Sequence, residues 1–204
     1  MDTVYIETSI VSHATAWPSS DPAVSVLQQQ ARAWWAIERP KFSLVTSQLV
    51  LDEASLGDPD AAAERLKLLA GIPLIPTDKR VEEIADELIA RSLIPETARL
   101  DALHVASAAV GSVQFLLTQN CRLNSWGVST MTHNPILEEL YAIREKLLAD
   151  AGGDVQKYLA GVRQREAASG RLLKPTSQRT NRSTGAAKSG VLAEGNRSSP
   201  PGDR

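Results

Sequence analysis

The chain has 204 residues, a formal net charge of −2 and a single cysteine. This length accommodates one full hydrophobic core and an appendage, and the single cysteine excludes an internal disulfide and is typical of a reducing compartment. The sequence begins without the basic and apolar regions of a signal peptide, and no apolar run approaches the ~20 residues of a membrane span. We therefore expect a soluble, cytoplasmic protein.

Short apolar runs alternate with helical patterns over the first two thirds of the chain. Ser47 is placed to cap one helix, Asp58 and Pro59 to begin the next, and Gly71 to end it. Strands alternating with helices predict βαβ units, and hence a parallel sheet covered by helices on both faces. We expect strands at 4–6, 42–46, 74–76 and 113–118, and helices at 23–37, 47–56, 58–70, 77–92 and 98–110.

The pattern changes after residue 124. Asn134 and Pro135 are a typical helix start, and the helix that follows carries an apolar stripe. Asp154 begins a second amphipathic helix, which ends near Gly170. Residues 175–204 are rich in Ser, Thr, Gly, Asn, Pro and Arg and contain little to bury, so we expect a disordered tail. The stripe consists of Ile136, Leu140, Ile143 and Leu147.

Asp101 lies in the stretch ARLDALHVASAAV, which is apolar on nearly every side of a helix. Burying an ionised carboxylate is costly unless a cation or hydrogen bonds compensate it. Polar side chains also stand where ligands gather in parallel sheets, at the carboxyl ends of strands, since Glu7 follows the first strand and Asn120 the last. Glu53 lies on the helix after the second strand, with apolar residues at its helical neighbour positions.

Three carboxylates and an amide, Glu7, Glu53, Asp101 and Asn120, thus come from four separate segments. Carboxylates placed together repel one another unless a divalent cation is present. Hard oxygen ligands without a His or Cys cluster suit Mg²⁺ or Mn²⁺ rather than zinc. Such an ion acidifies a bound water and neutralises the charge that develops on a phosphodiester, so the pattern indicates metal-dependent hydrolysis of a phosphate ester.

Four segments together resemble the PIN-domain ribonucleases, in particular the VapC-type toxins of bacterial toxin–antitoxin pairs. They are VYIETS, SQLVLDEASLGDP, PETARLDALHVASA and FLLTQN, in that order, and the resemblance covers roughly residues 3 to 122. It implies a PIN-like parallel sheet between helices and Mg²⁺- or Mn²⁺-dependent cleavage of single-stranded RNA. The metal-binding and catalytic positions of the family fall on Glu7, Glu53, Asp101 and Asn120.

The resemblance ends at residue 123, where the last strand and helix of such a domain are expected. From Met131 the sequence instead resembles the small antitoxin-like partner of these nucleases. This implies a nuclease domain at 1–123, a junction at 124–130, a helical antitoxin-like segment at 131–174 and the tail at 175–204. Partner segments of this kind cover the acidic pocket with a basic side chain. Arg171 is the candidate for this inhibitory contact, within its own chain or in a neighbouring copy of a homo-oligomer.

Two functions stay open at this point. One is an active endoribonuclease with RNA as its partner, and the other is a truncated or self-inhibited, catalytically silent fusion that only binds protein. Phosphotransfer receivers and haloacid dehalogenases also gather carboxylates, but they need an Asp where Glu7 stands. We expect His104 to be a packed helix residue, Trp34 and Trp35 to make core or dimer contacts, and Asp52 to point away from Glu53.

Overall fold

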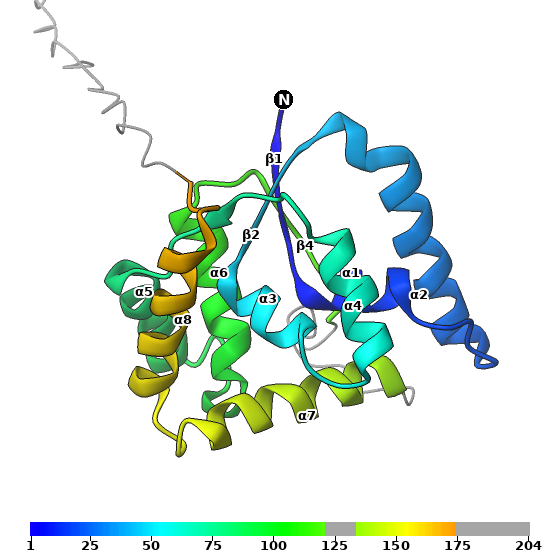
Figure 1. Ribbon diagram of the computed structural model, residues 1–204. Helices are drawn as coiled ribbons and strands as arrows, with labels where there is room; N and C mark the ends of the chain where they lie inside the picture. The colour runs from blue at the N-terminus through cyan, green and yellow to red at the C-terminus, as the bar shows by residue number, and fades with distance from the viewer. Residues whose placement is uncertain (121–133, 174–204) are drawn as a thin grey trace, which may run out of the picture. The chain divides into compact units, whose positions relative to one another are not determined.

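Four short strands lie parallel in one sheet in the computed structural model, which describes residues 1–120 and 134–173 (Figure 1). The strand order is β3-β2-β1-β4, and helices cover both faces, so the predicted α/β class with a parallel sheet is confirmed. The strands are β1 (Thr3–Ile6), β2 (Ser43–Ser47), β3 (Leu74–Ile75) and β4 (Phe115–Leu117).

Strand β1 lies inside the sheet and pairs with a neighbour on each side. Val4 pairs with Leu44 of β2 on one side and with Phe115 of β4 on the other. Tyr5 and Ile6 are fully buried, which is typical of a strand covered on both faces. Because all strands run in the same direction, the residues that follow β1 and β4 arrive at one common edge.

Helices begin and end close to the residues that the sequence indicates, although α1 was not anticipated. Its sequence TSIVSHAT is short and rich in hydroxyl residues, so it carries little helical periodicity. A short π-helix (Trp34–Glu38) and a 3₁₀ helix (Arg39–Lys41) follow α2, and another 3₁₀ helix (Glu96–Ala98) precedes α6. The helices are α1 (Thr8–Thr15), α2 (Pro22–Ala33), α3 (Gln48–Ala54), α4 (Pro59–Leu68), α5 (Lys79–Ala90), α6 (Arg99–Val110), α7 (Pro135–Asp150) and α8 (Val155–Ser169).

One expected cap, Ser47, and one expected helix start, residue 77, differ from the prediction. Ser47 makes no side-chain cap, because its hydroxyl instead lies 2.7 Å from the hydroxyl of Tyr5. Helix α5 is capped by Asp78 rather than Thr77, and the Asp78 carboxylate accepts the backbone N–H groups of Arg80 and Val81. Thr77 is hydrogen-bonded to Glu166 of α8 instead. The Thr77 N–H donates to the two carboxylate oxygens of Glu166, at 2.9 Å to Oε1 and 3.1 Å to Oε2.

Residues 134–173, which we call the arm, pack onto the residues before 120 as part of one unit that extends to residue 174. Asn134 and Asp154 cap α7 and α8 as predicted. Leu159 and Val162 of α8 join a buried apolar cluster with Leu49 of α3 and Leu103 of α6. Helix α7 crosses the end of the sheet where β1 stops (Figure 1).

Several sequence-based expectations lie outside the described residues. They concern the junction at 124–130, the first residues of the antitoxin-like segment and the tail at 175–204. Trp34 and Trp35 are described, and they pack against the apolar cluster around β1, as expected for core contacts. Among the helices that the structure describes, none has the length and apolar character needed to cross a bilayer.

Candidate metal centre

Glu7 stands at the end of β1 and caps the N-terminus of α1. Its Oε2 accepts the backbone N–H of Ser9 at 2.9 Å, the Ser9 hydroxyl, and the Thr118 hydroxyl at 2.9 Å. The residue is fully buried, and its other oxygen, Oε1, accepts from Nη2 of Arg144 at 2.6 Å. The helix start therefore fixes the orientation of this carboxylate.

Glu53 projects from α3 into the same space and is 1 % exposed. Its Oε2 accepts from the Thr8 hydroxyl, and its Oε1 lies 3.0 Å from Nε2 of His104. A carboxylate only accepts, so Nε2 donates to Glu53, and Nδ1 lies 2.9 Å from the Tyr5 hydroxyl. The buried chain from Tyr5 through His104 thus holds Glu53 in one orientation.

Asp101 lies in the first turn of α6 and is 4 % exposed, so this carboxylate is buried with its helix. Its Oδ1 accepts a hydrogen bond of 2.8 Å from Nδ2 of Asn120, which is itself fully buried just after β4. The structure therefore brings the predicted residues together from four segments. Asp52, next to Glu53, points elsewhere and pairs with Arg165 of α8.

A cation from the arm meets these carboxylates, and it is Arg144 of α7. Its Nε lies 2.7 Å from Glu53 Oε1, Nη1 lies 2.5 Å from Asp101 Oδ1, and Nη2 lies 2.6 Å from Glu7 Oε1. One planar guanidinium thus donates to three carboxylates, a task that suits its fork of donors. This contact provides the compensation that a buried Asp101 requires, because Arg144 and Asn120 both donate hydrogen bonds to its carboxylate.

The expected contact of Arg171 within its own chain is corrected. In its own chain this guanidinium does not reach the acidic pocket and instead donates to the backbone carbonyls of Leu69 and Ile72. Arg144 was missed because it stands beside the apolar stripe and reads as a solvated charge. One signal pointed to it, since residue 144 lies four positions after Leu140 and so on the same face of the helix.

Two further contacts hold α7 over the pocket. The Tyr141 hydroxyl donates to Oδ1 of Asn120 at 2.7 Å. At the start of the helix, Asn134 Nδ2 lies 3.2 Å from Nε2 of the fully buried His13, whose Nδ1 donates to the Ser9 carbonyl at 2.8 Å. Burial lowers the pKa of His13 and so favours the neutral ring that accepts from Asn134. His13 had shown no role in the sequence.

Burial and neighbouring charges shift the pKa values of the site residues in opposite directions. Burial alone would raise the pKa of Glu53, but the charges of Arg144 and His104 lower it to about 2. Burial would lower the pKa of Arg144, but the charges of Glu53, Glu7 and Asp101 raise it above the ordinary arginine value. The pKa of Asp101 is raised, because burial outweighs the effect of Arg144.

The residues present fit a divalent cation. Ligand atoms of Glu7, Glu53 and His104 lie within 4.8 Å of one another, so this buried group could hold a metal ion. His104 was not among the predicted ligands, although it is packed in its helix as expected. Carboxylate oxygens favour Mg²⁺ or Mn²⁺. His104 would become a ligand through Nε2 only after this nitrogen gives up the hydrogen that it donates to Glu53.

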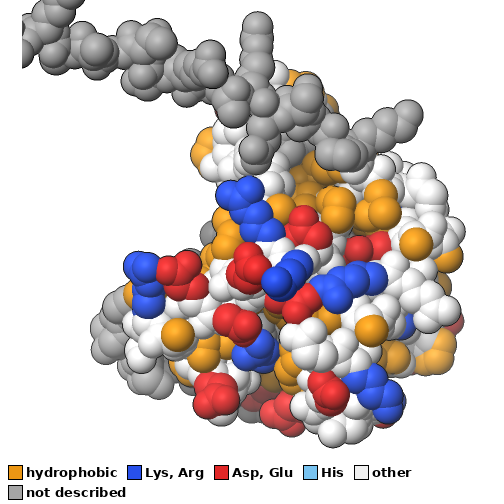
Figure 2. Space-filling view, turned by 90° about the vertical axis from the view of Figure 1, so that its left-hand side faces the viewer, with side chains coloured by type: hydrophobic (Ala, Val, Ile, Leu, Met, Phe, Trp, Pro, Cys, Tyr) orange, Lys and Arg blue, Asp and Glu red, His pale blue; other side chains and the backbone are white. Residues whose placement is uncertain are grey.

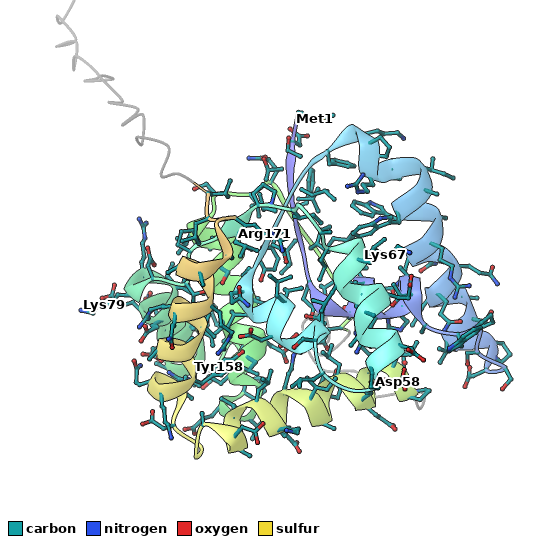
Figure 3. The ribbon with its side chains drawn as sticks, viewed as in Figure 1. Met1, Asp58, Lys67, Lys79, Tyr158 and Arg171 are labelled. Carbon is teal, nitrogen blue, oxygen red and sulfur yellow. The ribbon has the colours of Figure 1, made fainter. Side chains whose placement is uncertain are left out.

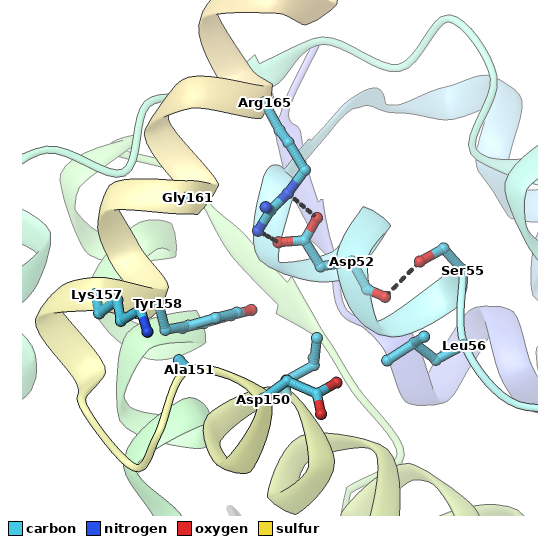
Figure 4. A pocket seen from close by; sticks show the side chains of 10 residues that line it. Asp52, Ser55, Leu56, Asp150, Ala151, Lys157, Tyr158, Gly161 and Arg165 are labelled. Carbon is cyan, nitrogen blue, oxygen red and sulfur yellow. Dashed lines mark hydrogen bonds and ion pairs between the residues drawn. The ribbon is translucent and has the colours of Figure 1, made fainter.

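The space beside the candidate ligands is small, and a larger pocket lies away from them. Asp101 and Arg144 line a space of about 60 Å³, well below the ~300 Å³ of a typical ligand pocket. A larger pocket of about 410 Å³ lies between α3, α7 and α8 (Figure 4). There Arg165 pairs with Asp52, and no candidate ligand residue lines it. The face that carries α5 and α8 mixes basic and acidic side chains (Figure 2).

Comparisons with models of known protein families, with curated proteins and with solved structures find no match to this chain.

Proposed function

We propose that the chain is a metal-dependent endoribonuclease of the PIN type, the toxin component of a toxin–antitoxin pair, which hydrolyses phosphodiester bonds of single-stranded RNA. One observation carries the proposal. Glu7, Glu53 and Asp101 converge from three segments at the carboxyl edge of a parallel sheet, with Asn120 bonded to Asp101. The four segments that resemble PIN-domain nucleases contain these same residues.

Each side chain has a role in the proposed site. Glu7, Glu53 and Asp101 would hold Mg²⁺ or Mn²⁺, and Asn120 orients Asp101 through its amide. The bound cation supplies an acidified water and neutralises charge on the phosphodiester. Thr8 and His104 hold the two oxygens of Glu53, so that this carboxylate keeps its position when a ligand approaches.

A second candidate function rests on Arg144. Its guanidinium takes the position where a cation would meet the three carboxylates, and the hollow beside it does not admit a nucleotide. We infer that this is a self-inhibited state of a toxin–antitoxin-like fusion, in which the arm excludes metal and RNA. In that state the protein acts only through protein contacts.

The test compares RNA cleavage by the full-length protein and three variants in Mn²⁺. We expect Arg144→Ala to cleave a fluorescent single-stranded RNA faster than the unsubstituted chain by roughly tenfold or more, because the competing cation is gone. EDTA and the added substitution Asp101→Asn should each abolish the gain. Lys146→Ala removes a charge from the exposed side of α7 and should change nothing.

The outcomes separate the two functions. Cleavage that depends on metal and Asp101 supports the nuclease, and a gain on loss of Arg144 supports self-inhibition. If Arg144→Ala keeps its circular dichroism spectrum and binds Mn²⁺ but cleaves no RNA, the chain is a silent binding protein. If it stays folded and binds no Mn²⁺, the metal site itself is wrong.

A further inference from the structure

The outer edge of β3 carries a short extended segment from the end of the arm. The N–H of Leu74 donates to the Arg171 carbonyl at 2.9 Å, and the N–H of Leu173 donates to the Leu74 carbonyl at 2.8 Å. These bonds form a parallel bridge between Leu74 and Leu172. An edge strand offers unpaired backbone groups to any extended chain, so this pairing is independent of sequence.

Arg171 adds recognition that does depend on sequence. Its Nε and Nη2 lie 3.0 and 2.5 Å from the Ile72 carbonyl, and Nη2 lies 2.7 Å from the carbonyl of Leu69. Leu69 is the C-cap residue of α4, and its carbonyl also accepts the Ile72 N–H at 3.3 Å. The helix dipole favours a cation at this position. The planar fork of a guanidinium reaches both carbonyls in one fixed geometry, for which it is better suited than an ammonium group.

Two neighbours of Arg171 complete the pattern. Gly170 ends α8 with φ of 65°, a left-handed conformation that glycine adopts without strain and that turns the chain onto β3. Leu173 packs against the apolar cluster around β1, whereas Leu172 is 37 % exposed. In this segment Gly170 provides the turn and Arg171 the guanidinium. Leu172 points outward, and Leu173 packs into the apolar cluster.

We infer that the β3 edge and the end of α4 form a peptide-docking slot, which binds a separate extended peptide of the type Gly-Arg-aliphatic-Leu. The arm's own residues 170–173 are its resident occupant. The slot lies along the outer edge of the sheet, and Arg171 stands apart from α7 in Figure 3. Its occupant touches none of the candidate metal ligands, so the inference goes beyond the proposed function and does not depend on it.

The experiment uses the full chain with Arg171→Ala, which weakens the resident segment and leaves the slot's backbone unchanged. The probe is a fluorescent peptide with the sequence ASGRLLK of residues 168–174. We expect saturable binding by fluorescence polarisation, and at least ~10-fold weaker binding of the peptide ASGALLK, since hydrogen bonds from a charged group are lost. ASGKLLK should fall between them.

Hydrogen exchange locates the binding. In the unsubstituted chain the Leu74 amide should be protected, in Arg171→Ala it should exchange at least ~10-fold faster, and ASGRLLK should restore the protection. Arg171→Lys gives a second, milder variant in case the alanine variant unfolds. Lys157→Ala is the matched control, because it removes one charge from α8 and its ammonium has no partner among the residues that the structure describes.

Equal binding of ASGRLLK and ASGALLK, or no binding at millimolar peptide by a folded variant, would overturn the inference. Binding without protection of Leu74 would also overturn it, because the peptide would then sit elsewhere. A dimer of the unsubstituted chain that disappears with Arg171→Ala would assign the slot to a second copy instead. RNA cleavage plays no part in these readouts.

Discussion

The two ends of the arm contact the rest of the protein through arginines that differ in what they bind. Arg144 is 6 % exposed and donates to three carboxylates, whereas Arg171 is half-buried and donates to two backbone carbonyls. The first contact neutralises charge that would otherwise be buried alone. The second satisfies neutral carbonyl groups, which carry no charge that must be compensated. The same residue type therefore carries very different energetic weight at the two ends.

The largest expected effect comes from Arg144→Ala. Without metal, three buried carboxylates lose their cation, and we expect the free energy of unfolding at pH 7 to fall by about 3–5 kcal/mol. Urea unfolding in EDTA measures this loss. Mn²⁺ should stabilise the variant more than the unsubstituted chain, because it replaces the missing positive charge. An unchanged urea midpoint in EDTA would show that the carboxylates do not need Arg144.

Acid should weaken the same end of the arm. The pKa of Glu53 lies at about 2 in the folded chain against an ordinary value of 4.5, so its ionised form stabilises the fold. This contribution is complete above pH 4.5, is lost as the pH falls toward 2, and is on the order of 3 kcal/mol. Burial raises the pKa of Asp101, so the ionisation of this side chain lowers the stability of the fold as the pH rises.

Comparison with Glu53→Gln isolates the contribution of Glu53. The variant keeps the size of the side chain but cannot ionise, so the difference in unfolding free energy between it and the unsubstituted chain should shrink between pH 4.5 and 2. Urea titrations at several pH values measure that difference. A difference that stays constant over this range would show that the charge of Glu53 is not coupled to folding.

A smaller loss is expected at the other end. Arg171→Ala removes hydrogen bonds from a charged donor to two neutral carbonyls, so we expect the free energy of unfolding to fall by about 1–2 kcal/mol, independently of Mn²⁺. Thermal unfolding with and without Mn²⁺ measures both features. A loss as large as that of Arg144→Ala would remove the contrast between the two ends.

The smallest effect should come from Lys146→Ala. Lys146 pairs with Asp150 at 2.8 Å on the exposed side of α7, and both side chains are more than half exposed. Such pairs contribute little, so we expect a change below ~0.5 kcal/mol. If urea unfolding shows a larger loss, the contrast between the two ends reflects the general charge of the arm rather than the buried site.

Local chemistry determined much of this protein. Alternating strands and helices predicted the parallel sheet, and the cap residues Asn134, Asp154 and Asp58 stand where the sequence placed helix starts. Glu7, Glu53, Asp101 and Asn120 were found because each stood at a strand end or in an apolar surrounding, where a polar side chain needs a reason. These features depend on near neighbours in the sequence.

Only the tertiary structure decided which arginine meets the carboxylates. Arg144 bonds to Asp101, Glu53 and Glu7, which lie 43, 91 and 137 positions away in the sequence. A charged residue on an amphipathic helix carries no local mark of such partners, so Arg171 was an equally reasonable choice. The sequence specified that a buried carboxylate needed a cation, because that cost is local, but the identity of the cation depends on how distant helices pack.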